Sequence, residues 1–240
     1  MSRRPSPAAV LVWDFDGTLY RGIAACLHYA RGIADTLEPG RRATYLQSVE
    51  RYLAGQGGVD AADGWEAAVM LAGGGRGASR AFGDAFARTR AFMLTDACEL
   101  EVPDGMHSFL ERMSGRARRV LVSNTPAFGV VPMLERLGLL NAFDELSCDS
   151  AKPYRFSVRL RTLAELHEVE ARSVISIGDH FVNDIEPAFE TGCSTAYIDP
   201  FAVGPRGRAD LEAPRFEDLL EPLESWVEAR EASIVGTGAR

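Results

Sequence analysis

Short strand-like runs, each ending in polar residues, constrain the fold of this chain more than any other feature. The runs are Ala8–Trp13, Arg119–Val122, Phe143–Ser147, Val174–Ile177 and Thr195–Ile198. Such short runs are typical of strands buried on both faces of a parallel sheet. Helical spacing separates the later runs, over Met106–Met113, Phe128–Leu137, Phe156–Leu166 and Ile185–Thr191. The alternation predicts βαβ units and an α/β fold with a Rossmann-like, doubly wound parallel sheet.

The stretch 21–99 has a different pattern, because it carries helical spacing and no strand-like run. Glycine-rich turns at 55–58 and 73–77 interrupt it, and they lack the strand-to-helix context of a nucleotide-binding loop. We therefore expect a catalytic core formed by 1–20 and 100–228, with an all-helical cap inserted at 21–99. The Gly- and Ala-rich end, 229–240, is expected to be a flexible tail.

Composition excludes several classes of protein. The chain has 46% hydrophobic and 25% charged residues, which is ordinary for a globular protein, and its net charge of −8 disfavours binding to nucleic acid or to anionic membranes. No segment reaches the roughly 18 apolar residues that span a bilayer, and the first apolar run is too short for a signal peptide. The four cysteines are scattered without a CxxC pair, which indicates a reducing compartment, so we expect a cytoplasmic protein.

The basic residues are 25 arginines and a single lysine, Lys152. This excludes a P-loop, which needs Gly-Lys-Ser/Thr, and any Schiff-base chemistry would have to use Lys152. A codon bias that favours arginine explains the composition. Position 152 is then a candidate for a site where a guanidinium cannot replace a compact ammonium.

Polar side chains follow four of the predicted strands. They are Asp14 and Asp16, Ser123 and Asn124, Lys152, and Asp179 and Asp184. Ligands of open parallel sheets bind beyond the carboxyl ends of the strands, so we expect these groups to meet there. Carboxylates at that density repel one another unless a cation lies among them, and oxygen ligands favour Mg²⁺. Taken singly, each group also has an ordinary interpretation as a turn, a helix cap or a surface charge.

Four of these segments resemble, in order, the motifs of the haloacid dehalogenase (HAD) superfamily. The sequence DFDGT from Asp14 resembles the first motif, and Ser123 after a hydrophobic strand resembles the second. Lys152-Pro153 resembles the third, and GDHFVND from Gly178 is similar to the fourth. The resemblance covers about 8–20 and 100–225, and 21–98 takes the place of the family's helical cap. His180 departs from the pattern, because the family commonly has a small hydroxyl residue there.

The resemblance implies a role for each group. Asp14 would attack phosphorus and form an aspartyl phosphate, and Asp16 would protonate the leaving alcohol and then deprotonate water. Lys152 would pair with Asp14 and the phosphoryl group. Ser123, with backbone amides near Asn124, would bind the phosphoryl oxygens.

The same resemblance implies a bound Mg²⁺ ion. Asp14, the backbone carbonyl of Asp16 and Asp179 would hold it, with Asp184 acting directly or through water. We therefore expect a Mg²⁺-dependent phosphatase for a small phosphorylated metabolite. The alternatives are a phosphosugar mutase or phosphotransferase on the same fold, and a catalytically silent binding or regulatory protein. The dehalogenase branch is disfavoured because it lacks the second acid, Asp16.

Other residues have mainly structural interpretations. Tyr45, Tyr52 and Trp65 are expected in the core of the cap, and His28 is expected to pack there. Tyr20 and Arg21 follow the first motif closely enough to line the cleft, although a place outside it is favoured for both. The sequence does not indicate an oligomeric state.

Overall fold

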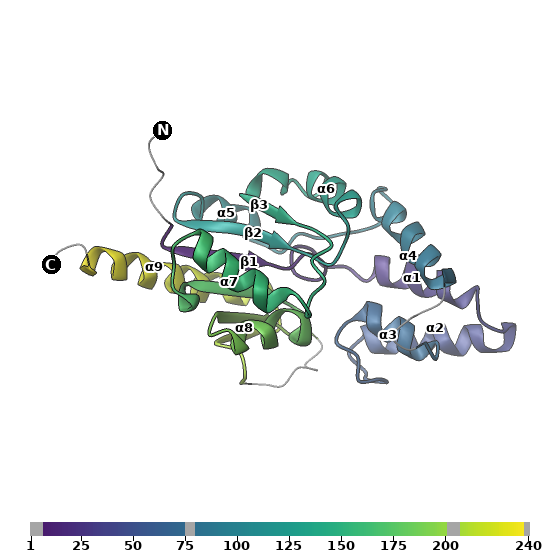
Figure 1. The fold of residues 1–240 in the computed structure, drawn as a ribbon. Helices are drawn as coiled ribbons and strands as arrows, with labels where there is room; N and C mark the ends of the chain where they lie inside the picture. The colour runs from purple at the N-terminus through teal and green to yellow at the C-terminus, as the bar shows by residue number, and fades with distance from the viewer. Residues whose placement is uncertain (1–6, 75–79, 201–206, 238–240) are drawn as a thin grey trace. The chain divides into compact units, whose positions relative to one another are not determined.

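Six parallel strands form one sheet in the order β3-β2-β1-β4-β5-β6. Figure 1 shows β3, β2 and β1 side by side in this order. Their bounds are β1 Ala9–Trp13, β2 Ala117–Val122, β3 Glu145–Ser147, β4 Val174–Gly178, β5 Ser194–Ile198 and β6 Leu211–Ala213. The strand order reverses between β1 and β4, which is the topological switch point of a doubly wound sheet. The predicted Rossmann-like α/β fold is confirmed.

The computed structural model describes residues 7–74, 80–200 and 207–237. These residues form two units. The sheet unit holds residues 7–20, 102–200 and 207–237, and the helical unit holds 21–74 and 80–101. Within the described residues, no helix combines the length and the apolar character needed to cross a bilayer.

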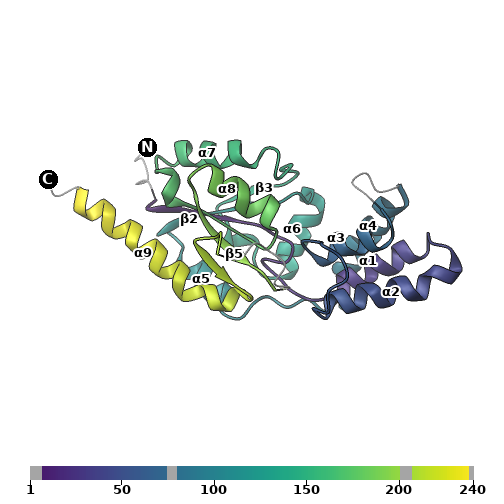
Figure 2. The ribbon, with the colours of Figure 1, turned by 90° about the horizontal axis from the view of Figure 1, so that it is seen from below.

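Helices cover both faces of the sheet. They are α5 Met106–Arg112, α6 Ala127–Arg136, α7 Phe156–Leu166, α8 Glu186–Glu190 and α9 Leu220–Thr237. The shorter pieces are η1 Leu140–Ala142, η2 Ala171–Ser173, the π-helical turn η3 Phe181–Ile185, and η4 Phe216–Leu219. Figure 2 shows α7 and α8 on one face of the sheet, and α5 and α9 on the other. The sheet is therefore the middle layer of three.

Alternating side chains of β1 build a core on each face. Val10 and Val12 pack in one cluster with Phe156 and Leu160 of α7. Trp13 points to the opposite face, where its ring lies 6.0 Å from Phe109 of α5. All five residues of β1 are buried, which explains why the strand reads as an unbroken apolar run.

The helical unit consists of four helices in the described residues. They are α1 Ala24–Ala34, α2 Pro39–Leu53, α3 Gly64–Leu71 and α4 Arg80–Met93. Tyr45 and Tyr52 are buried, and their hydroxyls donate to the carbonyls of Ala68 and Ala61. These two tyrosines are therefore core residues, as predicted.

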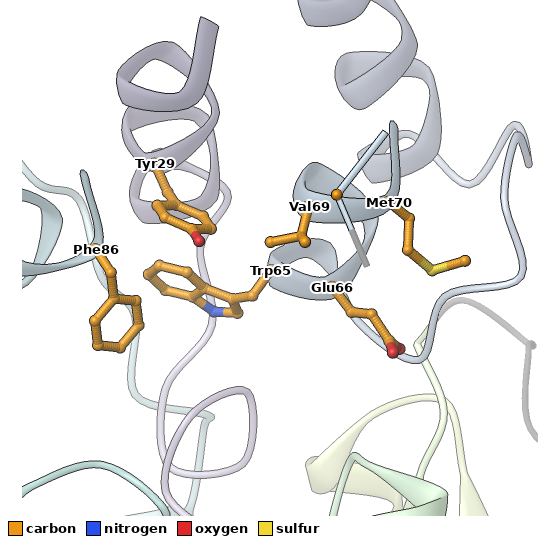
Figure 3. A pocket seen from close by; sticks show the side chains of 7 residues that line it. Tyr29, Trp65, Glu66, Val69, Met70 and Phe86 are labelled. Carbon is orange, nitrogen blue, oxygen red and sulfur yellow. The ribbon is translucent and has the colours of Figure 1, made fainter. Parts of the chain in front are cut away.

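A pocket of about 510 Å³ lies within the helical unit (Figure 3). Tyr29, Trp65 and Phe86 converge on it, with the Tyr29 and Trp65 ring centroids 5.3 Å apart. Trp65 thus lines a pocket as well as packing against the core of the unit. His28 stacks on Phe92 at 4.3 Å, which agrees with the expected packing role.

The prediction of a flexible tail over 229–240 was wrong for residues 229–237, which belong to α9. Contacts with other parts of the sheet unit order this segment. Arg116 pairs with Glu231 at 2.7 Å, and the Arg230 guanidinium donates to the carbonyl of Arg172. Glycine and alanine content alone did not reveal these long-range partners.

Candidate active site

Polar residues directly follow the three central strands of the sheet. Trp13, at the end of β1, pairs with Leu121 of β2 and Ile177 of β4. The residues that come next in the chain, Asp14 and Asp179 among them, therefore meet at one edge. The sheet register explains why groups more than 160 positions apart in the chain, such as Thr18 and Asp179, are in contact.

Lys152 lies at the centre of this edge. Its Nζ donates to Asp14 Oδ1 at 2.5 Å and to Asp184 Oδ1 at 2.6 Å. The ammonium also lies 5.5 Å from the centroid of the Phe156 ring. Lys152 is only 6% exposed, so the two carboxylates and the ring leave little room around its charge.

The loop before Lys152 is held against the end of β2. The Asn124 side-chain amide donates to the Lys152 carbonyl at 3.0 Å, and the Lys152 N–H donates to Asn124 Oδ1 at 2.6 Å. Ala151 has a left-handed backbone with φ 52°, which is costly for a residue other than glycine. The amide of Asn124 thus positions the lysine, in addition to the phosphate-binding role that the resemblance assigns to its backbone.

Three carboxylates lie close enough together to share one cation. Asp14, Asp179 and Asp184 each offer an oxygen, and these oxygens lie within 4.8 Å of one another. A donor set of carboxylate oxygens fits Mg²⁺. Glycine makes the close approach possible, because a Cβ at Gly178 would lie 2.5 Å from Asp184 Oδ2.

Burial sets the charge state of this cluster. It raises the pKa of Asp14 to about 7, Lys152 opposes the rise, and the Asp184 and Asp16 carboxylates add to it. Burial alone would lower the pKa of Lys152, but Asp14 and Asp184 together raise it above its ordinary value. The lysine is therefore a permanent cation among these carboxylates.

Asp16 is held differently from the other three carboxylates. Its Oδ2 accepts a hydrogen bond from Thr125 Oγ1 at 2.7 Å, and its Oδ1 accepts one from the Tyr20 hydroxyl. The side chain of Asp16 is not a member of the three-carboxylate cluster. Sequence analysis missed Thr125, whose only signal was its position directly after Ser123 and Asn124.

Ser123 lies beneath this edge and is 2% exposed. Its Oγ accepts a hydrogen bond from the Thr125 N–H at 3.0 Å. His180 acts locally: its Nδ1 accepts from the Asn183 N–H at 3.3 Å, and its backbone N–H donates to Asp184 Oδ2 at 3.2 Å. His180 therefore caps η3 and orients Asp184.

No family model matches the sequence, and no curated protein matches it either. Its structure, in contrast, matches many solved structures. YfnB from Bacillus subtilis, described as a HAD hydrolase bound to magnesium, has a TM-score of 0.60 and 17% identity, with 91% of this chain and 99% of YfnB covered. A protein from Haemophilus somnus, described as a predicted phosphoglycolate phosphatase, has a TM-score of 0.60 and 18% identity, with 90% and 97% covered.

L-2-haloacid dehalogenase from Xanthobacter autotrophicus is a further match, with a TM-score of 0.52 and 18% identity over 90% of this chain and 98% of that one. Fold and site together define a Rossmann-like α/β protein with carboxylates at the carboxyl edge of its sheet. More particularly, the chain has the fold of the HAD-superfamily hydrolases, with a helical insertion after the first strand.

Proposed function

We propose that this chain is a Mg²⁺-dependent phosphatase that hydrolyses a small phosphorylated metabolite through an aspartyl phosphate on Asp14. One observation carries the proposal: the buried Lys152 ammonium joins Asp14 to Asp184 within the three-carboxylate cluster. A carboxylate beside a permanent cation can approach an anionic phosphoryl group, which it would otherwise repel.

In the first half-reaction, a carboxylate oxygen of Asp14 forms a bond to phosphorus. The bond from phosphorus to the ester oxygen breaks, and that oxygen takes the proton of the Asp16 carboxylic acid. The products are an alcohol, an aspartyl phosphate on Asp14, and an ionised Asp16. Ser123 donates its proton to a phosphoryl oxygen, because its own oxygen already accepts from Thr125.

In the second half-reaction, Asp16 acts as the base. It takes a proton from water, the water oxygen bonds to phosphorus, and the bond to the Asp14 oxygen breaks. Inorganic phosphate leaves, Asp14 is again a carboxylate, and Asp16 is again protonated. Each residue thus returns to its starting state after one turnover.

Asp14, Asp179 and Asp184, with the backbone carbonyl of Asp16, would hold the Mg²⁺ ion. When bound, the ion would neutralise charge on the nucleophile and the phosphoryl group. Lys152 opposes the rise in the pKa of Asp14 that burial causes, and so favours the ionised carboxylate that ligation requires.

Dehalogenation is the second candidate, since a haloacid dehalogenase has the same fold. Departure of a halide ion needs no proton, so a dehalogenase has no use for an acid at position 16. The two hydroxyls that hold Asp16 favour chemistry in which an alcohol leaves. Phosphoryl transfer to an acceptor other than water, as in a mutase, would use the same residues.

A direct test uses p-nitrophenyl phosphate with the purified chain. We expect hydrolysis with Mg²⁺, no hydrolysis with EDTA, and none in Asp14→Asn, which keeps the size of the side chain. A panel of phosphorylated metabolites that includes phosphoglycolate would then define the substrate. Halide release from L-2-chloropropionate without hydrolysis of any phosphate ester would refute the proposal in favour of dehalogenation.

A further inference from the structure

The Asp16 carboxylate accepts hydrogen bonds from two hydroxyl groups. Both of its oxygens accept from hydroxyl groups, those of Tyr20 and Thr125. We call Tyr20 and Thr125 the hydroxyl pair. Asp14 and Asp184, in contrast, share the Lys152 ammonium.

The hydroxyl pair is built into the sheet unit. Tyr20 is 4% exposed and Thr125 is 6% exposed. The Tyr20 ring packs edge-on against Phe15 with centroids 5.5 Å apart. The Thr125 N–H donates to Ser123 Oγ at 3.0 Å, so the segment that follows β2 fixes Thr125. Neither hydroxyl is a mobile surface group.

Hydroxyl partners suit a carboxyl group that must change its protonation state. An ammonium or a backbone N–H can only donate, so it favours the ionised acid. A hydroxyl donates to a carboxylate, and it can rotate to accept from a carboxylic acid. The pair can therefore keep the Asp16 side chain in one orientation whether or not it carries a proton.

We infer that Tyr20 and Thr125 are positioning residues that hold Asp16 in one orientation through both of its roles, as acid and as base. The inference rests on the proposed phosphatase function. It assigns to each hydroxyl a task in proton transfer to the leaving group, and none in binding the phosphoryl group.

Two aryl esters of similar shape separate this role from a general structural one. Phenol is a weaker acid than p-nitrophenol, so it is the poorer leaving group. Cleavage of phenyl phosphate therefore depends on protonation of the leaving oxygen by Asp16, and cleavage of p-nitrophenyl phosphate depends on it much less. The ratio kcat/KM covers the steps up to departure of the phenol. In Thr125→Val, which removes the hydroxyl and keeps the shape, we expect kcat/KM for phenyl phosphate to fall about tenfold further than for p-nitrophenyl phosphate.

Three further variants complete the test. Thr125→Ser keeps a hydroxyl and should restore most of the loss, and Tyr20→Phe should repeat the selective loss. Tyr45→Phe removes a buried hydroxyl of the helical unit and should leave both esters unaffected. If Thr125→Val does not fold, the comparison of Tyr20→Phe with Tyr45→Phe still tests the positioning role, because only Tyr20→Phe should lose activity selectively toward phenyl phosphate.

An equal loss for both esters, or no loss, in folded Thr125→Val or Tyr20→Phe would overturn the positioning role. That result leaves the phosphatase proposal intact, provided that the wild type is active with Mg²⁺ and Asp14→Asn is not. If the wild type hydrolyses neither ester in the presence of Mg²⁺, the proposed function fails and the inference fails with it.

Discussion

The surroundings of Lys152 explain why this position has a lysine in a chain whose other 25 basic residues are arginines. Its Nζ lies between Asp14 and Asp184, at 2.5 and 2.6 Å, over the Phe156 ring. A planar guanidinium is wider than an ammonium and cannot fill the same position. At an exposed position such as Arg215, beside Asp218, any positive charge suffices.

We therefore predict that Lys152→Arg lowers kcat about 100-fold, as the loss of one pre-positioned donor does in other enzymes. The reciprocal change Arg215→Lys is the matched control and should leave kcat unchanged. Steady-state hydrolysis of p-nitrophenyl phosphate measures both. A Lys152→Arg enzyme with near-normal kcat would mean that the lone lysine reflects codon usage only.

Gly178 determines whether Asp184 can approach the other carboxylates. An added Cβ would lie 2.5 Å from Asp184 Oδ2 and 2.6 Å from its Cγ, so Gly178→Ala must displace the carboxylate. We expect Mg²⁺ affinity, measured by calorimetry, to fall by about tenfold or more, as for other disturbed metal sites. Gly83→Ala in α4 is the control, since no atom lies within 4 Å of its added Cβ. Equal affinities in the two variants would contradict this account of the cluster.

The raised pKa of Asp14 predicts a pH dependence of stability when Mg²⁺ is removed. The unfolded chain ionises this group near 3.8 and the folded protein near about 7, so the folded state binds more protons in between. Stability from this group is therefore lost as the pH rises through that interval. The amide side chain introduced by Asp14→Asn cannot ionise, so the variant does not lose this stability. In EDTA, the Tm of the variant minus the Tm of the wild type should therefore increase by several degrees as the pH rises. A difference in Tm that stays constant across the interval would show that the pKa of Asp14 is not raised.

Among the helices and strands, β1 and β4 made two motif residues predictable, because each of these buried strands is directly followed by an aspartate. Asp14 comes after β1 and Asp179 after β4, and the parallel register brings them together. The partners of Asp16 could not be predicted in this way. Thr125 meets Asp16 across 109 positions of the chain, and a hydroxyl beside Ser123 has many equally ordinary interpretations.

Apolar burial holds α9 in place, and its ion pairs contribute less. Leu223 is fully buried, whereas Arg116 and Glu231 are partly exposed. We predict that Leu223→Ala lowers the free energy of unfolding by about 2–5 kcal/mol. Glu231→Gln should cost about 0–1 kcal/mol, less in high salt, because exposed ion pairs are screened. Urea unfolding compares the two, and an equal or larger cost for Glu231→Gln would reverse this ranking.

At the scale of the whole molecule, alternating strands and helices were sufficient to predict the sheet and its helical insertion. The five predicted strands all form. β1, β4 and β5 are buried along their whole length and leave a clear apolar signal, whereas β3 is only partly buried. The edge strand β6 was not predicted, since Leu211–Ala213 is three residues long and only partly buried. The extent of α9 was underestimated because its contacts join residues more than 100 positions apart.

A covalent mechanism places the phosphoryl group on the protein, where it can be located by mass spectrometry. Asp16→Asn lacks the base of the second half-reaction, but p-nitrophenolate can leave without the acid. With p-nitrophenyl phosphate and Mg²⁺, this variant should accumulate the intermediate. After an acid quench, peptide mass spectrometry should find the phosphoryl group on Asp14. A phosphoryl group on another residue, or turnover retained in Asp14→Asn, would contradict the account.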